Sequence, residues 1–84
     1  MILVLNCGSS SLKFCLFDEH ETPRARGVVE RLGQRESTLV CERNGEQMRR
    51  SLLAADHRRA LGAVVDALSE GGLAADALEG VGHR

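Results

Sequence analysis

Aromatic side chains are almost missing from this sequence, which has no Trp, no Tyr and two Phe in 84 residues. Hydrophobic residues still make up 43% of the chain, so its core has to be built mainly from Leu, Val and Ala. That fraction is typical of a globular domain and excludes a disordered chain. A chain of this length forms at most one small domain.

The sequence also lacks an excess of charge of either sign, since its formal net charge is −1. This balance excludes the broad basic surface of a nucleic-acid or anionic-membrane protein, so we expect neither partner. Lysine is scarce as well, because Lys13 is the single lysine among 11 basic residues. A compact ammonium at this one position indicates that a point charge is needed there and not a planar guanidinium.

The cysteines and the hydrophobic runs exclude further classes of protein. Cys7, Cys15 and Cys41 form no C-x-x-C pair and have no His at zinc spacing, which argues against a disulfide framework and a zinc site. The opening run "MILVLN" is too short for a signal peptide, and no run reaches membrane length. We therefore expect a reduced, cytoplasmic protein.

Hydrophobic periodicity predicts an α/β fold with an antiparallel meander followed by one helix. The strands are expected at about 2–5, 11–18, 25–32, 38–43 and 47–53. The helix is expected at about 57–70, with Asp56 as its N-cap and Gly71–Gly72 as its stop. A further strand begins at about 81–84, and we expect it to lack a pairing partner within this chain.

The stretch "LNCGSSSLKF" joins the first two predicted strands and has the composition of an anion site. Gly8 lets a backbone approach an anion closely, and the N–H groups of a tight turn form a concave nest. Serine hydroxyls add donors, and Ser11 and Lys13 project to the same side of the second strand. The candidate phosphate-binding residues are Gly8, Ser9, Ser10, Ser11 and Lys13.

Two interpretations of this stretch remain open on spacing alone. A Walker A loop is excluded, because Leu12 and not Gly precedes Lys13 and a strand follows in place of a helix. What remains is either a phosphate site between two strands or a polar hairpin turn without a ligand.

A family resemblance favours the phosphate site. "VLNCGSSSLKF" matches every fixed position of N-x-G-S-[ST]-[ST]-x-K, the N-terminal signature that acetate kinases carry after an apolar strand. "RGVVERLG" is similar to the third strand of that family, "DHRRALGAVVDAL" to its first helix, and "GVGHR" to the start of its G-H-R-V-V-H-G-G segment. Propionate kinases share the opening motif and are the nearest alternative.

The resemblance implies the ribonuclease H-like fold shared by acetate and sugar kinases, chaperone ATPases and actin. It also implies that residues 1–84 are only the N-terminal strands and first helix of a first domain, with a second domain absent. Residue by residue, Asn6 resembles the magnesium-contacting Asn, and Lys13 resembles the lysine near the ATP phosphates. Arg84 resembles the catalytic arginine that binds the carboxylate substrate and the transferring phosphoryl group.

The implied activity is reversible transfer of the γ-phosphoryl of ATP to acetate, which gives ADP and acetyl phosphate with Mg²⁺ as cofactor. The family suggests a homodimer for the full-length protein, and an isolated segment of this length is expected to be inactive. A different class also stays open, in which the chain is a non-catalytic phosphate-binding or interaction module.

We expect no catalytic role for the three histidines or for Asp56 and Glu42. His20 and His57 fall in a turn and at a helix start, where a solvated histidine is the favoured interpretation. Asp56 is explained as a cap and Glu42 as part of a strand face. His83 is not proposed as a catalyst.

Overall fold

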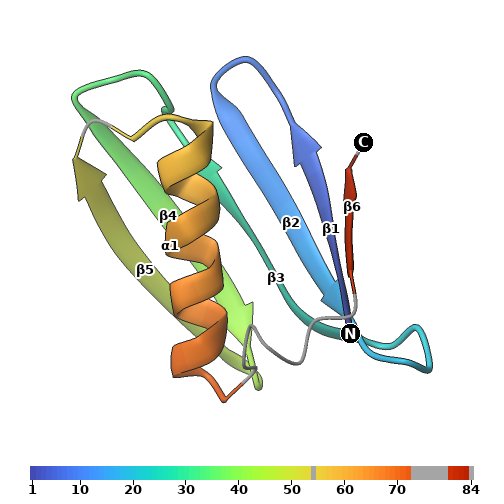
Figure 1. Ribbon diagram of the computed structural model, residues 1–84. Coiled ribbons are helices and arrows are strands. Elements are labelled where there is room, and N and C mark those ends of the chain that lie inside the picture. Colours follow the sequence, from blue (N-terminus) through green and yellow to red (C-terminus); the bar gives the residue numbers. More distant parts are fainter. Residues whose placement is uncertain (54, 73–79, 84) are drawn as a thin grey trace.

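The computed structural model describes residues 1–53, 55–72 and 80–83 and consists of one sheet and one helix (Figure 1). The strands run in the order β5-β4-β3-β2-β1-β6 across the sheet. Their bounds are β1 (Ile2–Cys7), β2 (Ser11–Phe17), β3 (Pro23–Glu30), β4 (Glu36–Arg43), β5 (Glu46–Leu53) and β6 (Gly80–His83), and the helix is α1 (His57–Glu70). The predicted meander and helix are thereby confirmed.

The expectation that the last strand lacks a pairing partner is wrong. β6 pairs in parallel with β1, with Ile2 opposite Gly80 and Leu5 opposite His83. Within the meander β1 pairs only with β2, so the meander leaves the other edge of β1 open, and β6 pairs there. A parallel neighbour needs a long crossover connection, and the segment after β5 contains α1, which supplies such a connection.

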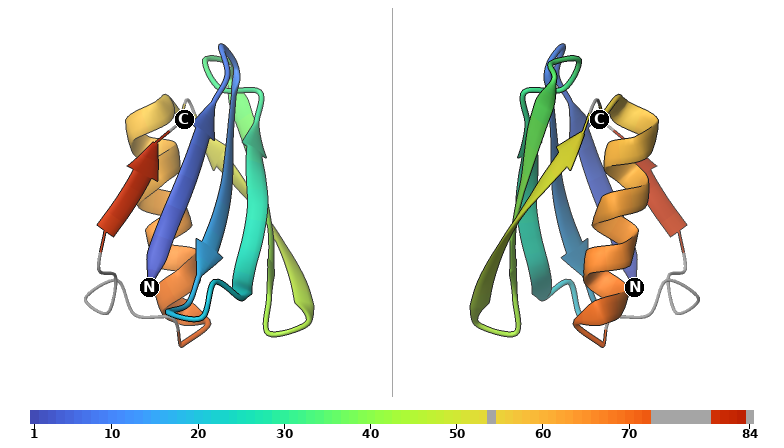
Figure 2. Two further views of the ribbon diagram at one scale, coloured as in Figure 1. Left: turned by 90° about the vertical axis from the view of Figure 1, so that its right-hand side faces the viewer. Right: turned by 90° about the vertical axis from the view of Figure 1, so that its left-hand side faces the viewer.

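Alternation along the strands divides the sheet into a covered and an open face. α1 lies against one face only, as both edge-on views show (Figure 2). The largest fully buried side chains come from both the strands and α1, and they are Leu3, Leu12, Leu16, Leu39, Leu68, Val29, Val64, Cys41 and Ser37. We call the opposite side, which no other described element covers, the open face.

Both ends of α1 are attached by polar contacts. Asp56 accepts a hydrogen bond from the Arg59 N–H at 2.8 Å, which confirms the predicted N-cap. At the other end the Arg43 guanidinium donates to the Ala67 carbonyl, and Arg50 makes a two-pronged ion pair with Glu70 at 2.9 and 3.0 Å. These Arg50 contacts lower the pKa of the Glu70 carboxyl and keep it ionised.

The cap supports a first testable prediction. Replacing Asp56 with Ala leaves the Arg59 N–H without its acceptor, so we expect the free energy of unfolding to fall by about 1 kcal/mol. Asp56→Ser keeps an acceptor and should retain most of the stability. Urea unfolding of both variants measures the difference, and equal loss in both would contradict the capping role.

None of the described helices is long and apolar enough to cross a membrane.

Candidate functional site

The candidate site is built around the turn between β1 and β2, residues Gly8–Ser10, which we call the serine loop. The Gly8 N–H donates to the Ser11 carbonyl at 2.9 Å and closes the hairpin. A Cβ at Gly8 would lie 2.9 Å from Ser11 Oγ, a distance that real Cβ atoms essentially never show. A side chain at position 8 would therefore displace the Ser11 hydroxyl, and glycine leaves room for that hydroxyl beside the turn.

Asn6 and Lys13 flank the serine loop and lie directly opposite each other in the β1–β2 register. Their strand neighbours Leu5 and Phe14 are buried under α1, so alternation places Asn6 and Lys13 on the open face. Both side chains are exposed, and neither has a hydrogen-bond or ion-pair partner within the described part of the chain. An amide oxygen and an ammonium are thus both available at one end of the sheet.

Lys13 lines three hollows, two of which lie beside Asn6 or the serine loop. One, of about 420 Å³, is lined by Ser10, Ser11, Lys13, Val28, Glu30, Arg31 and Gln34. The other, of about 270 Å³, is lined by Val4, Asn6, Lys13, Phe14, Cys15 and Phe17. The lysine stem therefore stands between a polar hollow next to the serine loop and a more apolar one on the open face.

The thiol beside this site does not supply charge. Burial raises the pKa of Cys15, and the nearby Arg26 lowers it by less. A raised pKa keeps the thiol protonated at neutral pH, so Cys15 acts as a small apolar wall and not as a nucleophile. All three cysteines are free, as the sequence predicted.

The serine loop is held in place by two other parts of the chain. The Leu32 N–H, in the turn between β3 and β4, donates to the Ser10 carbonyl at 2.9 Å. His57, the first residue of α1, places its Nε2 2.8 Å from the Gly8 carbonyl oxygen. The expectation that His57 is a solvated histidine is therefore wrong, because its ring nitrogen is bonded to the backbone of the serine loop.

His20 behaves as expected, with a side chain 80% exposed and only a loose ion pair of 3.7 Å to Glu19. Arg84, the candidate catalytic arginine, lies outside the described residues. Of the predicted site residues, the structure therefore brings together Asn6, the serine loop, Ser11 and Lys13.

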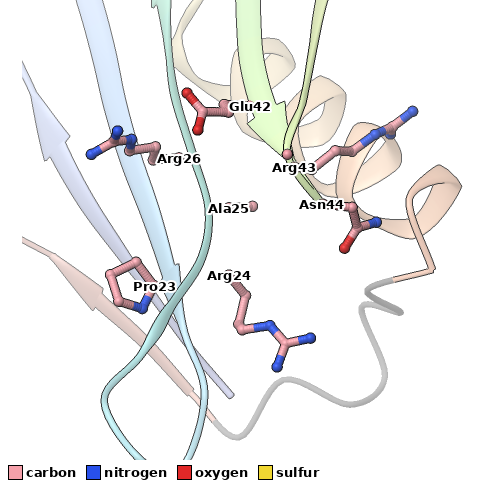
Figure 3. A pocket seen from close by; sticks show the side chains of 8 residues that line it. Pro23, Arg24, Ala25, Arg26, Glu42, Arg43 and Asn44 are labelled. Carbon is pink, nitrogen blue, oxygen red and sulfur yellow. The ribbon is translucent and has the colours of Figure 1, made fainter.

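A separate hollow of about 430 Å³, lined by arginines, lies at the opposite end of the sheet (Figure 3). Two of its arginines are already engaged, since Arg24 pairs with Asp18 at 3.5 Å and Arg43 with the Ala67 carbonyl. Arg26 lies opposite Glu42 in the strand register. None of the predicted site residues lines this hollow.

Serine hydroxyls, a tight turn that contains glycine and the unpaired Lys13 ammonium at one end of an α/β sheet make a site chemically suited to an oxyanion. The chain belongs to the Acetokinase family, whose family model matches residues 1–84. It is 41% identical over 87 residues to the acetate kinase of Campylobacter jejuni subsp. jejuni, a match that covers 99% of this chain and 22% of that protein.

Solved structures confirm the resemblance and the fold class. The crystal structure of Porphyromonas gingivalis acetate kinase is 32% identical with a TM-score of 0.87, and the match covers 99% of this chain and 22% of that one. A propionate kinase from Francisella tularensis subsp. tularensis is 28% identical with a TM-score of 0.86, and the match covers 99% and 21% of the two chains. The chain spans only about 22% of the length of the curated relative named above.

Proposed function

We propose that this chain is the N-terminal, phosphate-binding part of an acetate kinase, which transfers the γ-phosphoryl of ATP reversibly to acetate. The observation that carries the proposal is the unpaired Asn6–Lys13 couple beside the serine loop, in a chain 41% identical to an acetate kinase. The products are ADP and acetyl phosphate. A second domain and the rest of the acyl-substrate site come from a longer protein.

The residues of this chain bind and orient the phosphates. The Lys13 ammonium acts as a point charge on phosphate oxygens, and the hydroxyls of Ser9, Ser10 and Ser11 donate hydrogen bonds to them. Because these donors are in position before ATP arrives, no reorganisation is needed as charge develops during transfer. Arg84 is assigned by resemblance to the carboxylate and the transferring phosphoryl group, which a guanidinium fork binds bidentately.

Asn6 is the residue that fits a magnesium ion. Mg²⁺ takes oxygen ligands, keeps several waters and is shared with substrate phosphates, so a protein often contributes only one or two groups. The exposed Asn6 amide offers one oxygen beside the phosphate site. No cluster of three His, Cys, Asp or Glu among the described residues could hold a metal by itself. When bound, Mg²⁺ neutralises charge on the phosphate oxygens.

The curated acetate kinases that are 40–42% identical to this chain favour acetate as the substrate. An extra methylene is discriminated by roughly 10- to 200-fold in a fitted apolar pocket. We therefore expect kcat/KM of the longer protein for acetate to exceed that for propionate by at least about tenfold. A reversed ratio would assign a propionate kinase.

The experiment that tests the proposed function is an activity comparison between the full-length protein and the 84-residue chain. We expect ADP release by the full-length protein to require Mg²⁺ and acetate, with the acetyl phosphate trapped by hydroxylamine. The 84-residue chain should show no detectable turnover, because Arg84 and the phosphate site alone do not form a complete substrate-binding site.

Two outcomes would contradict this proposal. Turnover by the 84-residue chain would show that the remaining substrate groups are not needed. A full-length protein that binds ATP but phosphorylates neither acid would support the non-catalytic module.

We further propose a cytoplasmic homodimer without nucleic-acid or membrane partners, and light scattering of the full-length protein tests its oligomeric state.

A further inference from the structure

The contact between His57 and the serine loop joins residues that are 49 positions apart in the sequence. The His57 Nε2 lies 2.8 Å from the Gly8 carbonyl oxygen, and because a carbonyl oxygen can only accept, Nε2 is the donor. Both the neutral Nε2–H tautomer and the imidazolium can make this bond. The contact therefore supplies orientation without requiring charge on the ring.

His57 stands on a well-fixed part of the fold. It is the first residue of α1 and follows directly after the capping residue Asp56. The preceding Ala55 is buried, and its carbonyl accepts a hydrogen bond from the Gly33 N–H at 3.0 Å. The imidazole thus reaches the serine loop from a rigid base.

The other two bonds of the serine loop leave one peptide unit free to rotate. The Gly8 N–H donates to the Ser11 carbonyl, and the Ser10 carbonyl accepts from the Leu32 N–H. Neither bond involves the peptide between Gly8 and Ser9, so neither restrains its rotation. Glycine opposes such a rotation less than any other residue. Among the described residues, only His57 donates a hydrogen bond to the carbonyl oxygen of this peptide.

Holding that carbonyl also fixes a donor on the opposite side. In a trans peptide the C=O and the following N–H point in opposite directions. The Gly8 carbonyl points toward His57, the first residue of α1, so the Ser9 N–H points away from the start of the helix. Within the described residues this N–H has no protein acceptor, which leaves it available to an anion.

We propose that His57 is a positioning residue for phosphate binding, which holds the Gly8 carbonyl so that the Ser9 N–H is directed at a phosphate oxygen. This inference rests on the proposed function for the identity of the ligand. His57 itself touches neither ATP nor acetate in this account. Its loss should weaken the phosphate site while leaving the residues of that site in place.

Three substitutions in the full-length protein separate the donor from the bulk of the ring. His57→Gln places an amide N–H near the position of Nε2, His57→Asn places it near Nδ1 and too far from Gly8, and His57→Leu removes it. Arg58→Gln is the matched control, because Arg58 is the next residue of α1, is exposed and makes no hydrogen bond to the serine loop.

The readouts are steady-state kinetics and hydrogen–deuterium exchange of the peptide containing Gly8–Ser11, with and without Mg²⁺ tripolyphosphate. For His57→Leu and His57→Asn we expect kcat/KM for ATP to fall by about tenfold or more, since small misplacements of a binding group are costly. Tripolyphosphate should protect the peptide less than in the wild type. In His57→Gln, kcat/KM for ATP and the protection of the peptide should both lie within about threefold of the wild type. Arg58→Gln should change neither quantity.

The outcomes distinguish this inference from the proposed function. Wild-type kinetics in His57→Leu, or a loss in His57→Gln as large as in His57→Leu, would overturn the positioning role. The wild type could lack kinase activity while tripolyphosphate still protects its serine loop from exchange. If the loop of His57→Leu is then not protected, the positioning role holds and the proposed function fails. Absence of both activity and protection in the wild type would overturn both.

Discussion

Replacing Lys13 with Ala is expected to lower kcat/KM for ATP by roughly 30- to 1,000-fold in the full-length protein. The lysine is exposed on the open face, opposite Asn6, so its main contribution is a charge at the phosphate site. Loss of one charge-assisted contact to the transferring group costs about 2–4 kcal/mol of transition-state stabilisation. Thermal unfolding should change little, because the side chain contributes little packing.

Two further variants make this prediction specific. Lys13→Arg should recover activity only in part, because the planar guanidinium is broader than the ammonium. Arg49→Ala removes an exposed positive charge from β5, at the far edge of the sheet, and should leave kcat/KM nearly unchanged. Unchanged turnover and unchanged melting in Lys13→Ala would mean that the serines and the lysine are only a polar turn.

Replacing Gly27 with Ala is expected to have the largest effect on stability. Gly27 lies in β3 between Phe14 on β2 and Cys41 on β4. An added Cβ would overlap the Val40 carbonyl oxygen and lie 2.7 Å from Cζ of the buried Phe14 ring. Because backbone would have to move, we expect the free energy of unfolding to fall by about 3 kcal/mol.

Gly62 offers a matched control with the opposite expected sign. It is exposed on α1, and a Cβ there would have no other atom within 4 Å. Gly62→Ala should raise the free energy of unfolding by about 0.5–1 kcal/mol, since alanine loses less backbone entropy in a helix. Urea unfolding measures both variants, and a similar change in the two would contradict the steric explanation for Gly27.

Local patterns were sufficient to predict the elements of this fold. The predicted helix bounds agree with α1, because a cap, a helical repeat and a glycine stop all act within a few residues. Asn44 and Gly45, a pair that favours a two-residue hairpin turn, join β4 to β5 with φ values of 51° and 77°. Placement of Lys13 and Ser11 on one face followed from strand alternation alone.

Interactions between distant segments could not be predicted in the same way. The pairing of β6 with β1 depends on which sheet edge is free, a property of the assembled sheet and not of either segment. The partner of His57 is a backbone carbonyl, which every residue carries and which therefore leaves no signal in a sequence motif. Glycine is disfavoured inside a strand, and only the positions of the Val40 carbonyl and the Phe14 ring explain why it stands at position 27.

The contact between His57 and Gly8 also has a consequence for the order of folding. Each strand of the meander pairs with its neighbour in the sequence, so the β1–β2 hairpin closes a short loop at little entropic cost. The histidine arrives from 49 residues away and can bind the Gly8 carbonyl only after α1 has docked on the sheet. We therefore expect the turn to form early in folding and its Ser9 N–H to acquire a fixed direction late, when the helix packs.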